Sequence, residues 1–220
     1  MSGLISRVAA RACAAVVAIF VGLAGQSGAV ALADTAGSYG DPARAAQYWA
    51  PQSFGNNCVL MSVAGVVGQI TGHMPSEQEI VEVAKSTPSI AEQGKPVYTD
   101  PSGDGADTRD IGVLLAHYGI HAVTSDDAKG QTALAALENA LGSRHAVMIA
   151  VSSGTIWDGE KPKDGDHEVV VTGVDAAKGI AHLNDSGAED GSDEQVPMTT
   201  FMRAWQGGDF EMTVTRETVQ

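Results

Sequence analysis

The apolar residues along the chain change their spacing near residue 142, from the spacing typical of helices to short β-rich runs. The strongest helical pattern covers residues 58–70, CVLMSVAGVVGQI, where apolar side chains form two adjacent stripes. A helix that is apolar over so much of its surface is buried. One of the two asparagines before it would cap its start. Gly65 and Gly68 would let another backbone segment approach it closely.

Three further helices are predicted in the first part of the chain. Ser76-Glu77-Gln78-Glu79 is a capping box and opens a helix that reaches about residue 87. A second helix begins at Thr108 and ends at Gly119, and a third covers residues 132–141. Between the first two of these helices, residues 88–107 are expected to form a long loop.

The second part of the chain predicts an antiparallel sheet. The β-rich runs are HAVMIAVS, HEVVVTGV and GIAHLND, at residues 145–152, 167–174 and 179–185. The last two flank a hairpin loop, and a helix near 199–206 and a strand near 210–215 follow. An N-terminal helical part with a buried helix, packed on a C-terminal antiparallel β-sheet, is an α+β fold.

The first 33 residues have the pattern of a secretory signal peptide. Arg7 and Arg11 precede the apolar run at residues 12–24, and Ala31-Leu32-Ala33 places small residues where a signal peptidase reads, before Asp34. The apolar run is shorter than the roughly 20 residues of a membrane span, although an uncleaved anchor remains the alternative. We therefore expect a secreted or cell-envelope protein, with a flexible lead-in at residues 34–47 and one domain at residues 48–220.

Charge narrows the possible partners. The formal net charge is −14, and removal of residues 1–33 takes away two of the 13 basic residues and none of the 27 acidic ones, which leaves −16. Such a charge argues against nucleic acid or an anionic membrane as a partner. Acidic residues crowd two loops without the spacing of a calcium-binding EF-hand, so we expect no metal and no cofactor. Trp157 is expected to pack in the core or at its rim, and a place in the lining of a cleft is the alternative.

Loss of the signal peptide would remove Cys13 and leave Cys58 as the only cysteine. A single thiol in an exported protein is either a reactive group or a small buried hydrophobic residue. Cys58 lies at the start of the buried helix, where the helix N-terminus lowers the pKa of a thiol. To act as a nucleophile, it would also need a neighbouring base and a third group to orient that base.

Among the six histidines, His167 is the best candidate base because it opens a strand after a polar loop and can face a helix N-terminus. If Val174 pairs with Ile180 across the hairpin, Asp185 shares a face with His167, whereas Asn184 points away. A one-residue bulge would reverse this choice. Asp185 is therefore the predicted orienting group and Asn184 the fallback, and a simple turn at this sequence remains the alternative.

Gln52 stands six residues before Cys58, in the loop that enters the buried helix. Its amide, together with the backbone N–H of Cys58, could stabilise a developing oxyanion. An isolated loop glutamine is more often only solvated. The order of glutamine, cysteine, histidine and aspartate along the chain makes the functional interpretation stronger than any of the residues alone.

This order resembles the papain-like cysteine peptidases, and more narrowly peptidase family 39, the bacteriocin-processing type, in its stand-alone branch without a transporter. The matching segments are Gln52-Ser-Phe-Gly-Asn-Asn-Cys58, His167-Glu-Val-Val-Val-Thr-Gly-Val174, Leu183-Asn-Asp185 and, in the final helix, Phe201-Met-Arg-Ala-Trp205. The resemblance covers about residues 48–215. This sequence differs from the family pattern at Val59, where the family usually has glycine, and at Asn57, where the bacteriocin processors usually have an acidic residue.

The resemblance implies a secreted peptidase in which Cys58 is the nucleophile, His167 the base, Asp185 its orienting group and Gln52 the oxyanion donor. Its substrate would be a peptide or protein. Two alternatives stay open: an enzyme of the same fold that cuts cell-wall peptide or transfers an acyl group, and a secreted binding protein without turnover, which Val59 and Asn57 favour.

Overall fold

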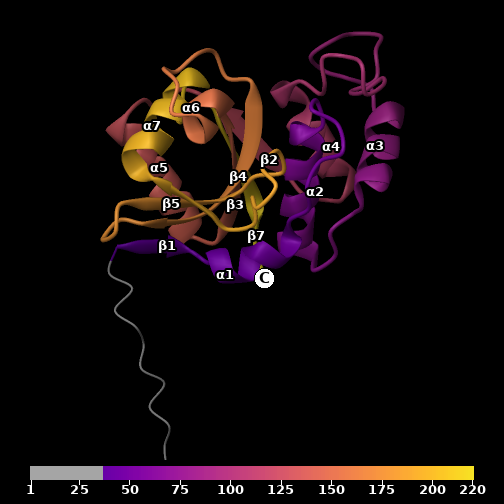
Figure 1. The fold of residues 1–220 in the computed structure, drawn as a ribbon. Coiled ribbons are helices and arrows are strands. Elements are labelled where there is room, and N and C mark those ends of the chain that lie inside the picture. Colours follow the sequence, from indigo (N-terminus) through magenta and orange to yellow (C-terminus); the bar gives the residue numbers. More distant parts are fainter. Residues whose placement is uncertain (1–36) are drawn as a thin grey trace, which may run out of the picture. The chain divides into compact units, whose positions relative to one another are not determined.

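The computed structural model describes residues 37–220 and shows helices on both sides of one antiparallel sheet (Figure 1). The signal peptide expected at residues 1–33 lies outside the described residues. No helix within residues 37–220 is both long enough and apolar enough to cross a membrane. The predicted α+β fold is confirmed, with one difference: the helices cover both faces of the sheet, not one.

The sheet has seven strands, and each neighbouring pair is antiparallel. Six strands follow the order β2-β7-β3-β4-β5-β6, and β1 pairs with β4 outside this path. The strands are β1 (Ser38–Gly40), β2 (Ala122–Ser125), β3 (His145–Val151), β4 (His167–Asp175), β5 (Ile180–Asn184), β6 (Glu194–Pro197) and β7 (Met212–Thr218). Strand β4, which opens with His167, is therefore interior and has strands on both sides.

Alternate residues of β3 and β4 belong to two separate hydrophobic cores. Met148 and Val170 pack with helices α2 (Cys58–Thr71), α3 (Glu77–Ser86) and α4 (Ile111–His117). Ile149 and Val169 pack on the opposite face with α5 (Gln131–Gly142) and α7 (Met198–Gly207), while the short α6 (Ser153–Trp157) lies against α7. This alternation explains why the β4 sequence is apolar at almost every position: both faces of the strand are covered.

Helix α2 is buried along almost its whole length, as its two apolar stripes predict. The glycines allow the predicted close approach, since a Cβ atom on Gly65 would lie 3.0 Å from the carbonyl oxygen of Tyr48. The helix ends at Gly72, whose φ of 81° is a left-handed conformation that favours glycine. The predicted asparagine cap is wrong in detail: Asn57 holds the N-cap position, but its side chain makes no capping bond.

The flexible lead-in expected at residues 34–47 is wrong where the structure describes it. Strand β1 forms three antiparallel pairs with the far end of β4, and α1 (Pro42–Ala45) and the 3₁₀ turn η1 (Ala46–Tyr48) follow it. Three residues of strand and one helical turn are too short to leave a periodic pattern in the sequence. The domain therefore includes residues before 48.

The other helices and strands that the sequence predicted agree with the structure to within a few residues. The capping box at Ser76 is present, and residues 88–107 contain neither a helix nor a strand of the sheet. The helix expected from Thr108 begins as the 3₁₀ turn η2 (Thr108–Asp110) and continues as α4. Strands β2 and β6 and helix α6 were not predicted, since each is only four or five residues long.

The pairing of β4 with β5 differs from the predicted one at the turn, but it agrees with the prediction near Asp185. Val174 pairs with Ala181, not with Ile180. A bulge between Val171 and Gly173 then shifts the register, so that Val170 pairs with Asn184. The error at the turn and the bulge cancel each other. At the open end of the hairpin, the register is therefore the one that was predicted for Asp185.

Candidate active site

Cys58 is the first residue of α2, and its thiol is half-buried and free. Burial raises the pKa of this thiol, but four contacts outweigh it. A hydrogen bond from His167 and the positive charge of that ring lower the pKa, as do the backbone N–H groups of Glu168 and Val59, so that the result lies below the ordinary value. A thiol in these surroundings is the kind that ionises and reacts.

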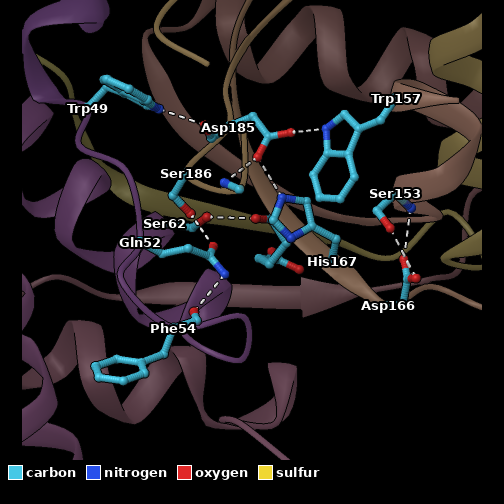
Figure 2. A network of polar contacts seen from close by, with 12 residues as sticks. Trp49, Gln52, Phe54, Ser62, Ser153, Trp157, Asp166, His167, Asp185 and Ser186 are labelled. Atoms are coloured by element: carbon cyan, nitrogen blue, oxygen red, sulfur yellow. Dashed lines mark hydrogen bonds and ion pairs between the residues drawn. The ribbon is translucent and has the colours of Figure 1, made fainter. Parts of the chain in front are cut away.

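His167 begins β4 and is buried beside Cys58. Its Nε2 lies 2.6 Å from Oδ1 of Asp185, so Nδ1 is the ring nitrogen left for the thiol (Figure 2). Burial alone would lower the pKa of His167. The hydrogen bonds to Asp185 and Cys58, together with their negative charges, raise it to about 10. The ring is thus a stable imidazolium when the sulfur is a thiolate.

Asp185 is fully buried, and three hydrogen bonds hold its carboxylate. Besides His167, the backbone N–H of Gly187 donates to Oδ1 at 2.8 Å, and the indole N–H of Trp157 donates to Oδ2 at 3.0 Å (Figure 2). Burial raises the pKa of Asp185, but these bonds and the charge of His167 lower it below its ordinary value. Asp185 is therefore an ionised acceptor that fixes the orientation of the imidazole.

Trp157 covers this pair. Its ring centroid lies 5.1 Å from that of His167, and its side chain is 44% exposed. It therefore stands between solvent and the His167–Asp185 bond. This is a position at the rim of the fold, which was one of the places expected from the sequence. Its N–H toward Asp185 could not be foreseen, because α6 was not a predicted element.

Asn184, the fallback, is held elsewhere. Its amide donates to the backbone carbonyl of Ala45 at 2.9 Å and accepts from the N–H of Asp193 at 3.2 Å. It ties the N-terminal segment to the sheet.

The carboxyl group of Glu194 also lies near Asp185. Burial raises the pKa of Glu194, and the charge of Asp185 raises it further, to about 7.

Gln52 lies on the loop before α2 and is tied to the residue after Asp185. Its backbone N–H donates to the carbonyl of Ser186 at 2.8 Å, and its Oε1 accepts from the Ser186 hydroxyl at 2.8 Å. Its Nε2 donates one hydrogen to the carbonyl of Phe54 at 2.9 Å, as Figure 2 shows. Within residues 37–220, the second hydrogen of Nε2 has no hydrogen-bond partner.

A network of hydrogen bonds around the buried Asn57 side chain fixes the loop that carries Cys58. The amide of Asn57 donates to Oε1 of Glu77 at 2.7 Å, and its oxygen accepts from the hydroxyl of Tyr98 at 2.7 Å. Glu77 also accepts from the backbone N–H of Ser53 at 2.8 Å. Asn57 is thus a structural residue whose neutral amide both donates and accepts.

A cleft of about 390 Å³ opens beside the thiol. Its walls come from the start of α2, the loop at residues 104–108, and residues 165–168 that lead into β4, with Ala150 of β3 between them. Volumes of about 300–1,000 Å³ are usual for ligand sites. Cys58 and His167 both line this cleft, so a ligand bound there would contact the thiol directly.

Residues 43–210 match the model of the Peptidase C39 like family. The chain belongs to this family. The resemblance to peptidase family 39 noted from the sequence is therefore confirmed.

Relatives of the C39-like chain are found among proteins and solved structures. Uncharacterized proteins of Mycobacterium bovis and Mycobacterium tuberculosis are each 48% identical over 215 residues, which covers 86% of this chain and 92% of theirs. A structure described as a C39-like peptidase from Bacillus anthracis has a TM-score of 0.56 at 17% identity, and covers 78% of this chain and 95% of its own. The peptidase domain of Streptococcus ComA, a bifunctional ABC transporter, has a TM-score of 0.51 at 15% identity, with coverages of 78% and 98%. These structures share the fold.

Proposed function

We propose that this C39-like protein is an exported cysteine peptidase that hydrolyses peptide bonds through Cys58, His167 and Asp185, with Gln52 as an oxyanion donor. One observation carries the proposal: a free thiol with a lowered pKa at a helix N-terminus, next to an imidazole bonded at 2.6 Å to a fully buried aspartate. This combination meets the requirements for an activated nucleophile. Export is supported by the pattern of residues 1–33.

In the first half of the reaction, the Cys58 thiolate attacks the carbonyl carbon of the scissile peptide bond. The carbonyl oxygen becomes an oxyanion, which the free N–H of the Gln52 amide and the backbone N–H of Cys58 stabilise. His167 gives the proton on Nδ1 to the departing amine nitrogen, and the carbon–nitrogen bond breaks. The products of this half are the free amine and a thioester on Cys58.

In the second half, water replaces the amine. Neutral His167 takes a proton from the water as the water oxygen attacks the thioester carbon, and the carboxylic acid product leaves with return of the Cys58 thiolate. Asp185 keeps the imidazole in place through both halves and stays ionised throughout. No metal or cofactor takes part in this scheme.

The test combines thiol labelling with peptide cleavage. Protein starting at Asp34 is expected to react with iodoacetamide at pH 6 faster than a free model thiol, because more of Cys58 is thiolate. Incubation with a peptide library, read by mass spectrometry, is expected to yield new chain ends. Cys58→Ala should abolish both signals, and His167→Ala should slow cleavage by roughly 10²–10⁴-fold.

The outcomes separate the alternatives. Labelling that appears only after denaturation would make Cys58 a buried hydrophobic residue and would refute the proposal. Rapid labelling without cleavage of any peptide would favour a binding protein that kept the site. Transfer of the acyl group to an added amine in preference to water would favour an acyltransferase.

A further inference from the structure

Glu168 is a buried acidic residue that the scheme above does not use. It follows His167 on β4, is 2% exposed, and within residues 37–220 its Oε2 has no hydrogen-bond partner. Buried polar atoms are nearly always paired, because burial of a carboxyl oxygen without a donor costs free energy. An unpaired carboxyl beside a nucleophile therefore requires an explanation.

The sheet directs this carboxyl toward the cleft that contains the thiol. Glu168 is directly paired with Ala150 of β3, so both side chains stand on the same face of the sheet. Both residues line the cleft beside Cys58. On this face, the next alternate residue of β4, Val170, packs against α2. The carboxyl thus lies on the floor of the cleft, between α2 and the loop at residues 104–108.

The walls of the cleft are acidic as well. Asp104 and Asp166 line it without a salt bridge to a lysine or arginine, whereas Asp107 is paired with Arg109 at 2.6 Å. Asp166 is held by the N–H and hydroxyl groups of Ser153. In the described part of the chain, no lysine or arginine lines this cleft. Among the described residues that line the cleft, the imidazolium of His167 is the positive group, and Asp185 already pairs with it. An ammonium or guanidinium group that enters the cleft would meet the carboxyl groups of Asp104, Asp166 and Glu168.

Burial is the main cause that favours the protonated form of the Glu168 carboxyl through its raised pKa. Burial raises its pKa well above the ordinary value, and the negative charges of Cys58 and Glu211 raise it further, against the opposing effect of His167. A bound cation would supply both the missing donors and the missing opposite charge. Glu168 would then release its proton to water as the cation binds.

We propose that this cleft is a subsite for a positively charged substrate side chain, with Glu168 as the residue that determines specificity. The substrate class is a peptide with a lysine-like ammonium or arginine-like guanidinium group next to the scissile bond. The reaction on that peptide rests on the proposed function, but the charge preference of the cleft does not. This allows the two proposals to be tested separately.

The first measurement needs no peptide cleavage. Methanethiosulfonate reagents transfer a small group to a thiolate and release methanesulfinate, and they exist in cationic (2-aminoethyl), anionic (2-sulfonatoethyl) and neutral (methyl) forms. Acidic clefts concentrate cations by roughly 10–10³-fold. We expect the cationic-to-anionic ratio of labelling rates at Cys58 to exceed that of a free thiol by at least about tenfold. The neutral reagent corrects for changes in thiolate content.

Substitutions test whether the carboxyl groups of the cleft cause the preference of Cys58 for cationic reagents. Glu168→Gln keeps the shape of the side chain and should reduce the rate ratio several-fold, and Asp104→Asn should reduce it by a smaller factor. Asp127→Asn removes the same charge from an exposed loop outside the cleft and serves as the control, with the wild-type ratio expected. If thermal melting shows that Glu168→Gln is unfolded, Asp104→Asn carries the comparison.

The second measurement uses substrates. For pairs of peptides that differ only in lysine or norleucine beside the cleaved bond, kcat/KM should favour lysine, and Glu168→Gln should reduce that preference by about tenfold or more. A wild-type ratio in both Glu168→Gln and Asp104→Asn, with either reagents or peptides, would overturn the subsite. A charge-selective thiol without any cleaved peptide would overturn the proposed function and leave the subsite standing.

Discussion

At the scale of single residues, Asp185 connects the parts of the site. Its carboxylate holds His167, while its backbone carbonyl accepts the indole N–H of Trp49 at 2.6 Å. Both the side chain and the backbone of this residue are thus fixed, by His167 on β4 and by Trp49 far earlier in the chain. A carboxylate held in this way maintains the positive charge on His167, on which the proposed proton transfer depends.

Asp185→Asn tests this dependence through the pH profile. The thiolate–imidazolium pair exists between the lowered pKa of Cys58 and the raised pKa of His167, about 10. Above that pH, His167 lacks the proton that the leaving amine needs, so activity falls. Loss of the Asp185 charge lowers the pKa of His167. We expect the alkaline limit to move to lower pH and kcat to fall by roughly 10²-fold.

Asn184→Ala is the matched control, because it removes the neighbouring amide that ties Ala45 to the sheet. It should lower the melting temperature while the alkaline limit stays near that of the wild type. A shift of the alkaline limit in Asn184→Ala and none in Asp185→Asn would contradict the assigned roles.

At the scale of elements, helix α2 positions the nucleophile only because another segment fits against it. A Cβ atom on Gly68 would lie 2.6 Å from Cδ1 of Tyr48 and 2.9 Å from Cβ of Met74, which is closer than such contacts occur. Tyr48 ends the turn η1 that continues from β1 and α1. The N-terminal segment and the nucleophile helix are therefore packed together at a glycine.

Gly68→Ala should destabilise the protein although alanine favours a helix. The gain in helix propensity is about 1 kcal/mol, but overpacking costs typically about 1–3 kcal/mol, so we expect a net loss measurable by urea unfolding. Gly112→Ala in α4 provides the comparison, because nothing lies within 4 Å of its added Cβ. It should stabilise the chain by about 0.5–1 kcal/mol. Equal effects at the two positions would refute the packing argument.

The sequence predicted the long elements and named Cys58, His167 and Asp185, which the fold brings together, because periodicity and residue type report on local structure. It missed β1 and α6, whose formation depends on partners far away in the chain. The hairpin shows the limit most clearly: the pairing of Val174 was off by one residue, and only the bulge after Val171 restored the register. Glu168 and the hydrogen bond from Trp157 to Asp185 were missed because tertiary contacts give both residues their surroundings.

At the scale of the whole molecule, one sheet separates two hydrophobic cores, and the candidate site lies at one end of the strand between them. Cys58 belongs to the core on the α2 face, and His167 opens the strand that both cores share. The buried carboxyl of Glu168 lies at the same end, so its protonation is linked to the stability of the entire fold.

The raised pKa of Glu168 predicts the direction in which the free energy of unfolding changes with pH. The unfolded chain releases the Glu168 proton near pH 4.3, while the folded chain retains it to much higher pH because the pKa is raised. Between pH 4.3 and the raised pKa of the folded state, the folded chain therefore binds up to one more proton, and stability falls as pH rises, by at most about 1.4 kcal/mol per unit. In urea unfolding at rising pH, the stability of the wild type relative to Glu168→Gln should fall over the range between these two pKa values. Parallel curves would mean that Glu168 is ionised in the folded protein.

The distance along the chain between α2 and β4 has a consequence for the time course of folding. Helix α2 can form locally, but its contact with β4 closes a loop of about half the chain, and such distant contacts form late. Until then, the thiol has the ordinary pKa of about 8.5 of an unfolded chain. The pKa of the Cys58 thiol therefore falls below its ordinary value only when the contact between α2 and β4 has brought His167 beside it.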